Sequence, residues 1–152
     1  MLLRIVIFLV INFAALGIGG MFTGSGVPSE WYQNLNKAPW TPPGWVFGAA
    51  WTTIMICFSI YMAYGWKQVN NRSLFITLFI LQWILNVMWN PVFFKFHAVL
   101  FGLILISALT LLVAYFLFDN LKLFKSWSFL ILPYFIWLLI ATSLNAYILI
   151  KN

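Results

Sequence analysis

The sequence has very little charge. Only 7% of its 152 residues are charged, whereas 64% are hydrophobic. A soluble domain carries roughly 25% charged residues, so this chain has too few polar side chains to cover a surface that faces water. Most of its surface must therefore face lipid. The basic residues are scattered along the chain, which gives no support to nucleic-acid binding.

Cysteine, histidine and acidic residues are also scarce. The single cysteine, Cys57, cannot form an intramolecular disulfide, and no cluster has the spacing of a metal site. We interpret the only histidine, His97, as an interfacial residue rather than a haem ligand. The two acidic residues, Glu30 and Asp119, lie outside the apolar runs, whereas a proton-coupled pump normally needs an acidic residue inside one. The sequence thus argues against ion-driven transport. It contains no conventional catalytic constellation and predicts neither a metal nor a required cofactor.

Long apolar runs are what the sequence does contain. A membrane helix needs about 20 mostly apolar residues. Five segments meet this requirement, at residues 2–22, 44–66, 73–93, 98–118 and 127–150. Backbone groups in lipid must hydrogen-bond within their own segment, so these spans are expected to be helices. We predict an all-α integral membrane protein: one domain, residues 1–152, formed by a bundle of five transmembrane helices. The first run is too long for a typical signal peptide and is interpreted as a retained helix.

A long connection, residues 23–43, separates the first two spans. It contains most of "WYQNLNKAPWTPPGW" (residues 31–45), which has three tryptophans and three prolines. Loops of this length are usually functional or disordered, and the tryptophans argue against disorder. Ser29 is a candidate N-cap for a short helix, and Pro42 and Pro43 suit the first turn of the second span. We therefore predict a structured loop.

Basic residues indicate the orientation in the membrane. One side would carry five of them and the other side three: Arg4, Lys67, Arg72, Lys122 and Lys125 against Lys37, Lys95 and Lys151. This bias favours an N-terminus on the inside. We expect a multi-pass protein of the bacterial cell membrane, or of the mitochondrial outer membrane if the source is eukaryotic.

Polar and aromatic residues within the spans indicate an internal site. Gln82, Asn86 and Asn90 are spaced by four residues and share one helix face, and polar groups at this depth usually face the bundle interior. Trp137 lies deep in the fifth span, one turn before the small residue Ala141. In the second span, Gly48, Trp51, Met55 and Ser59 form one stripe. These stripes have the composition of a small-molecule pocket, although simple packing and interhelical hydrogen bonds explain them equally.

Three motifs resemble one known family. The motifs are "WYQNLNKAPWTPPGWVFGAAW" (31–51), "LNVMWNPVFF" (85–94) and "LPYFIWLLIATSLN" (132–145). Together they resemble the TspO/MBR family of tryptophan-rich sensory proteins and translocator proteins, also called peripheral-type benzodiazepine receptors. The resemblance covers essentially the whole chain. It implies five transmembrane helices and a first loop that folds over one mouth of a ligand pocket.

The resemblance also implies ligands. Members bind porphyrins, haem-related tetrapyrroles, benzodiazepine-type compounds and, in animals, cholesterol, and some bacterial members resemble catalysts of light-dependent porphyrin breakdown. We expect a membrane receptor or sensor that binds protoporphyrin or a haem-related tetrapyrrole. The alternative is a transporter of porphyrins, sterols or other small amphipathic molecules. If porphyrin breakdown occurs, Trp51 and Trp137 are the residues expected to take part.

The expected ligand-binding residues come from the stripes and from the matching motif positions. They are Tyr32, Pro42 and Trp45 in the loop, Gly48 and Trp51 in the second span, Asn86, Trp89 and Asn90 in the third, and Trp137, Ala141 and Leu144 in the fifth.

The chain departs from the family pattern at three places. Pro39 is shifted by one position relative to the usual lysine–proline–x–tryptophan, and Leu105 replaces an acidic residue often found in the fourth span. The cholesterol motif of the fifth span is altered around Asn145, so sterol binding is doubtful. Small residues four apart, such as Gly20 and Gly24, together with the resemblance, predict a homodimer, although glycine is also simply frequent in membrane helices.

Overall fold

The computed structural model describes residues 1–152, and its regular elements are all helices. Five of them are long: α1 (Leu2–Gly26), α3 (Gly44–Gln68), α4 (Arg72–Asn90), α5 (Val99–Asp119) and α7 (Leu132–Lys151). The short elements are α2 (Glu30–Asn34), the π-helix η1 (Pro91–Lys95), α6 (Leu121–Phe124) and the 3-10 helix η2 (Lys125–Ile131). All five long segments are long and apolar enough to cross a membrane. The expected fold class, an all-α bundle of five spans with a structured first loop, is confirmed.

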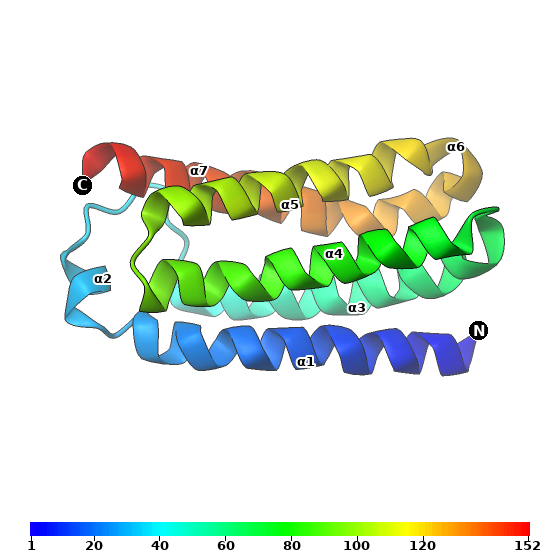
Figure 1. The fold of residues 1–152 in the computed structure, drawn as a ribbon, viewed down its shortest axis with the longest axis horizontal. Coiled ribbons are helices and arrows are strands. Elements are labelled where there is room, and N and C mark those ends of the chain that lie inside the picture. The colour runs from blue at the N-terminus through cyan, green and yellow to red at the C-terminus, as the bar shows by residue number, and fades with distance from the viewer.

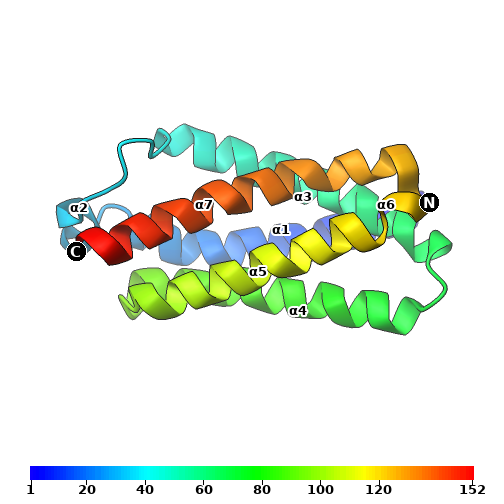
Figure 2. The same cartoon turned by 90° about the horizontal axis from the view of Figure 1, so that it is seen from above.

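The long helices form a closed ring. Contacts join α1 to α3, α3 to α7, α7 to α5, α5 to α4 and α4 back to α1. Figures 1 and 2 show the helices running side by side along the longest axis, with the two termini at opposite ends. Each helix thus has two neighbours, and its remaining face is left for lipid.

Three helix boundaries differ from the predicted apolar runs. α1 continues to Gly26, four residues beyond its predicted end, and proline stands at the other two boundaries. The third run was expected to continue to residue 93, but α4 ends at Asn90 and Pro91 begins η1. Proline has no backbone N–H and breaks the regular pattern. The last run was expected to begin at residue 127, but α7 begins at Leu132, with Pro133 in its first turn, where proline is tolerated. The 3-10 helix η2 occupies the preceding residues.

The core is aromatic and occupies the half of the bundle nearer the N-terminus. Phe58 lies at its centre, in ring contact with Phe79, Phe116 and Tyr134. The Tyr61 hydroxyl donates to the Phe116 carbonyl oxygen at 2.7 Å. Buried amides join the helices at the level of this core. Gln82 Nε2 donates to the Tyr134 hydroxyl at 2.6 Å, and Asn12 Nδ2 donates at 2.8 Å to the hydroxyl of Ser59, the residue after Phe58.

The loop between α1 and α3 is ordered by contacts with α7. As expected, Ser29 caps α2, its Oγ accepting from the Tyr32 amide. The Trp40 indole donates to the Ser143 hydroxyl at 3.1 Å, and its ring packs edge-on against Tyr147. The Asn36 amide donates to Asn152 Oδ1 at 2.8 Å. Residues 27–43, which we call the lid, lie at the end of the bundle where α7 ends (Figure 2), and Asn36 and Trp40 contact the C-terminal half of α7.

Candidate functional site

An aromatic and polar chain crosses the bundle under the lid. Trp51 on α3 packs against Tyr134 on α7, with ring centroids 5.9 Å apart at 71°. Gln82 Nε2 on α4 donates to the Tyr134 hydroxyl at 2.6 Å. Three helices that are distant in sequence therefore meet through one indole, one phenol and one amide. Trp51 is half-buried, whereas Tyr134 and Gln82 are almost completely buried.

Trp137 lies one turn farther along α7, on the lid side of Tyr134. Its side chain is 6% exposed and packs edge-on against Phe47 of α3 at 5.2 Å. The indole Nε1 is buried and has no hydrogen-bond partner within the chain, and the same holds for Oε1 of Gln82. A buried polar atom without a partner costs about 1–3 kcal/mol. The chain thus leaves one buried donor and one buried acceptor of this region without a partner.

The stripe of amides on α4 faces the interior, as expected. Gln82 and Asn86 are buried and Asn90 is half-buried. Asn90 is committed to a helix contact, because its Oδ1 accepts from the Thr23 hydroxyl at 2.9 Å and its Nδ2 donates to the Asn86 carbonyl at 3.1 Å. A Cβ on Gly19 would lie 2.7 Å from that Nδ2. Asn90 thus holds α1 against α4.

Trp89 belongs to a different junction from Trp51 and Trp137. Its indole donates to Asn145 Oδ1 at 3.1 Å, and Asn145 Nδ2 donates to the Val99 carbonyl at 3.0 Å. The Trp89 ring also stacks on Phe93 at 5.1 Å. These bonds tie α4, α5 and α7 together and leave the Trp89 N–H occupied. Only the ring of Trp89, and not its N–H, is therefore free to contact another group.

Leu144 and Ala141, two expected ligand-binding residues of α7, are buried to different degrees. Leu144 is buried, 8% exposed, next to the junction of Trp89 and Asn145. Ala141, one turn after Trp137, is half-buried and packs against the main core. Its small side chain limits how far this face of α7 extends toward its neighbours.

The lid residues differ in what they cover. Tyr32 packs on Phe94 at 5.5 Å, and the ammonium of Lys37 lies 4.9 Å above the Tyr32 ring. Burial raises the pKa of the Tyr32 phenol above its ordinary value, so the hydroxyl stays neutral at physiological pH. Pro42 is half-buried just before α3. Tyr32 therefore anchors the lid to η1 rather than pointing at the tryptophan pair.

Two expected site residues lie apart from the others. Trp45 is 75% exposed, and Gly48 is exposed with open space around it. At 100° per residue they share the outward face of α3, whereas Phe47 and Trp51 turn toward α7. The structure therefore does not bring Trp45 or Gly48 together with Trp137. Instead, Phe47 packs on Trp137 and Tyr134 packs on Trp51. The only sequence signal for Phe47 and Tyr134 was their helical spacing from these two tryptophans.

His97 lies outside the interior. Its ring stacks on Trp31 with centroids 4.0 Å apart at 11°, and its side chain is exposed. Its backbone φ is +54°, a conformation uncommon for a residue with a side chain. The stack joins the lid to the turn between η1 and α5.

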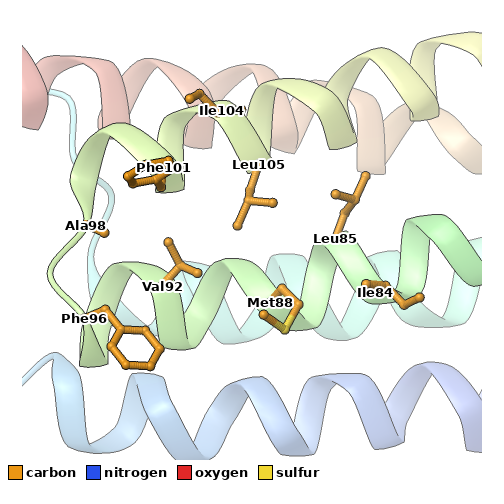
Figure 3. Close-up of a pocket in the computed structure, with 9 residues that line it drawn as sticks. All are labelled: Ile84, Leu85, Met88, Val92, Phe96, Ala98, Phe101, Ile104 and Leu105. Carbon is orange, nitrogen blue, oxygen red and sulfur yellow. The ribbon is translucent and has the colours of Figure 1, made fainter.

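Two cavities open at the surface of the bundle. A groove of about 440 Å³ lies between α4 and α5 (Figure 3), and a second cavity of about 390 Å³ lies between α1 and η1. Neither is lined by Trp51 or Trp137. Leu105, at the position where the family often has an acidic residue, lines the outer groove.

Comparison with known proteins gives a consistent result. The sequence model of the TspO/MBR family matches residues 6–150. A tryptophan-rich sensory protein of Cereibacter sphaeroides is 35% identical over 118 residues, 78% of this chain and 74% of that protein. The tryptophan-rich protein TspO of Archaeoglobus fulgidus is 33% identical over 91% of this chain and 90% of its own length. The human translocator protein is 31% identical over 83% of this chain and 79% of its own length.

Proposed function

This chain belongs to the TspO/MBR family of multi-pass membrane proteins, and we propose that it is a receptor for a tetrapyrrole, held under the lid between α3, α4 and α7. The observation that carries the proposal is the unpartnered donor of Trp137. A protoporphyrin or haem-related ring offers a flat face for indole stacking. It also offers propionate oxygens that accept a hydrogen bond, and a free-base ring adds imine nitrogens. Benzodiazepine-type ligands likewise combine aromatic rings with hydrogen-bond acceptors.

A buried hydrogen-bond acceptor in the same region supports the same class of ligand. Gln82 Oε1 is buried without a partner, and the pyrrole N–H groups of a free-base porphyrin can donate to it. The Asn86 side chain lies one turn away on the same face of α4. A purely apolar ligand would leave these polar atoms unsatisfied, which favours a ligand that carries both donors and acceptors.

The lid controls access to this region. Its bonds to α7, from Asn36 to Asn152 and from Trp40 to Ser143, lie at the exposed end of the bundle. Exposed hydrogen bonds contribute little net stability because water replaces them. The lid can therefore open locally without disturbing the aromatic core.

Titration with protoporphyrin IX, followed by quenching of tryptophan fluorescence, tests the proposal. The variant with both Trp51→Ala and Trp137→Ala should bind at least tenfold more weakly than the wild type, because the ring loses both its stacking surface and its donor. Trp127→Ala is the control, since Trp127 stacks on Tyr64 at the opposite end of the bundle. Equal affinity in the wild type and the double variant would contradict the assignment of Trp51 and Trp137 to the ligand pocket.

Any porphyrin breakdown in this site needs energy from outside the protein. The buried polar groups of the interior are amides, hydroxyls and indoles, with no carboxylate, imidazole or amine among them. We expect porphyrin loss to require both light and oxygen, with Trp51 and Trp137 as the residues that take part. Absorbance of bound protoporphyrin is followed with and without light and oxygen. Loss at an equal rate in the dark would contradict this mechanism.

A further inference from the structure

The groove between α4 and α5 faces the lipid and is entirely apolar (Figure 3). Its lining residues are Ile84, Leu85, Met88, Val92, Phe96, Ala98, Phe101, Ile104 and Leu105. Phe101 and Ile104 are more than half exposed. From Ile84 to Phe96 the groove follows α4 and η1 for roughly 18 Å at 1.5 Å per residue. The groove therefore extends from the η1 end of this span into the hydrocarbon region, parallel to the acyl chains of the membrane.

The second cavity, between α1 and η1, is partly polar. Its lining residues are Met21, Phe22, Ser25, Gly26, Ser29, Phe94 and Lys95. The Ser25 hydroxyl donates to helix carbonyls of α1, so its oxygen lone pairs remain able to accept. The cavity thus combines a hydroxyl acceptor with a cation.

Lys95 and Phe96 are neighbours in the chain and line different cavities. Lys95 lines the polar one, and its ammonium lies 5.8 Å from the ring of Phe96, which lines the apolar one. Lys37, on the same side of the membrane, is instead occupied by the Gln33 carbonyl at 3.1 Å and by the Tyr32 ring. An ammonium has three donors, and those of Lys95 are available to a group outside the chain.

We propose that the two cavities form one site for an anionic phospholipid of the surrounding membrane. The phosphate lies on Lys95, a hydroxyl of the head group donates to Ser25, and one acyl chain occupies the groove between α4 and α5. Charge complementarity selects this occupant, because a cation stands at the membrane end of an apolar groove. Glu30, the acidic residue of this end of the bundle, lines neither cavity. The site is separate from the interior region under the lid.

Native mass spectrometry tests the head-group part of the proposal. Protein in mild detergent receives equal amounts of dioleoyl phosphatidylglycerol and dioleoyl phosphatidylcholine, which have the same acyl chains. The wild type should retain phosphatidylglycerol about fivefold more strongly, the factor that corresponds to ~1 kcal/mol for one basic side chain at a membrane surface. Lys95→Gln should reduce this ratio to about one. Lys151→Gln removes the same charge on the same side and should leave the ratio unchanged.

A second pair of variants tests the groove. Ile104→Trp places a large ring in it and should reduce retention of both lipids alike. Leu111→Trp, at a position on α5 that is 72% exposed and outside the groove, should retain both as the wild type does. Melting temperatures of all variants verify the fold. An unchanged ratio in Lys95→Gln, or an equal loss in Lys151→Gln, would overturn the proposal. It is also overturned if Ile104→Trp changes the monomer–dimer ratio but not lipid retention.

Discussion

Trp83 and Trp137 both lie within membrane-spanning helices, but only one of their indole N–H groups has a partner in the chain. This difference distinguishes an indole that packs the bundle from one that binds a ligand. Trp83 on α4 donates to the Ile11 carbonyl of α1 at 3.0 Å, so its donor is used within the bundle. The Trp137 donor is buried and unpartnered. Folding alone does not favour a donor at that position, because a buried polar atom without a partner costs free energy. A ligand that accepts the hydrogen bond does give a reason.

The first prediction compares these two residues. Trp137→Phe should weaken protoporphyrin binding about fivefold, since a neutral hydrogen bond contributes ~1 kcal/mol, while the melting temperature changes little. Trp83→Phe should do the reverse, lowering the melting temperature because the bond to α1 is lost, with unchanged affinity. Both quantities are measured on the same detergent-solubilised samples. If Trp137→Phe binds as tightly as the wild type, its N–H does not contact the ligand.

The second prediction concerns Ala141, one turn after Trp137. Ala141→Thr adds two heavy atoms beside the indole and should weaken binding of bulky aromatic ligands about tenfold or more, the cost of crowding a pocket by a methylene-sized group. The added hydroxyl can bond back to the carbonyl of residue 137, which at most bends the helix slightly, so the fold should survive. Ala146→Thr is the control, on another face of α7. Unchanged affinity for every aromatic ligand would place Ala141 outside the site.

At the scale of the helices, the sequence alone predicted the features that depend on local chemistry. Apolar runs predicted the five spans because lipid forces the backbone to bond within each segment, and Ser29 predicted the start of α2 because a hydroxyl caps free amides. The spacing of Gln82 and Asn86 predicted their inward face. The changes of helix type before Pro91 and Leu132 were not predicted, because apolarity continues past the points where proline interrupts the regular helix.

Contacts between elements could not be derived from one sequence. Spacing placed Gly48 and Trp51 on one stripe of α3, but they straddle the boundary between its outer and inner faces, and only the position of α7 decides which one is inside. The bond from Asn12 to Ser59 at 2.8 Å, which joins α1 to α3, likewise involves two polar residues that have several candidate partners. The rotation of each helix is therefore set by the whole ring.

The third prediction tests how α1 meets the η1 element. A Cβ on Gly26 would lie 2.6 Å from Cβ and Cγ of Phe94, whereas a Cβ on Gly24 would meet nothing within 4 Å. Gly26→Ala should therefore lower stability by about 1–3 kcal/mol, as overpacking does. Gly24→Ala should leave stability equal or raise it, because alanine favours helix. Thermal melting in detergent compares them. A Gly26→Ala protein as stable as Gly24→Ala would show that η1 moves freely relative to α1.

At the scale of the whole molecule, the closed ring determines which surfaces remain for a partner. α1 contacts α3 and α4 through residues such as Asn12 and Gly19, and its opposite face carries Gly17, Gly20 and Gly24, around which a Cβ would find open space. Small residues let two helices approach closely in a membrane, where association depends on packing rather than on the hydrophobic effect. The expected homodimer is therefore tested on this face of α1.

The fourth prediction tests whether this face of α1 forms the homodimer contact. Gly20→Leu should shift the protein toward monomer in mild detergent, because an isobutyl group keeps the two α1 backbones apart. Its melting temperature as a monomer should not fall, since the substituted face contacts nothing within the chain. Leu111→Ala, at an exposed position on α5, is the control and should leave the mass distribution unchanged. Light scattering or native mass spectrometry gives the ratio of monomer to dimer. A wild-type protein that is monomeric in every mild detergent would contradict the homodimer, and a dimer unaffected by Gly20→Leu would place its interface on another helix.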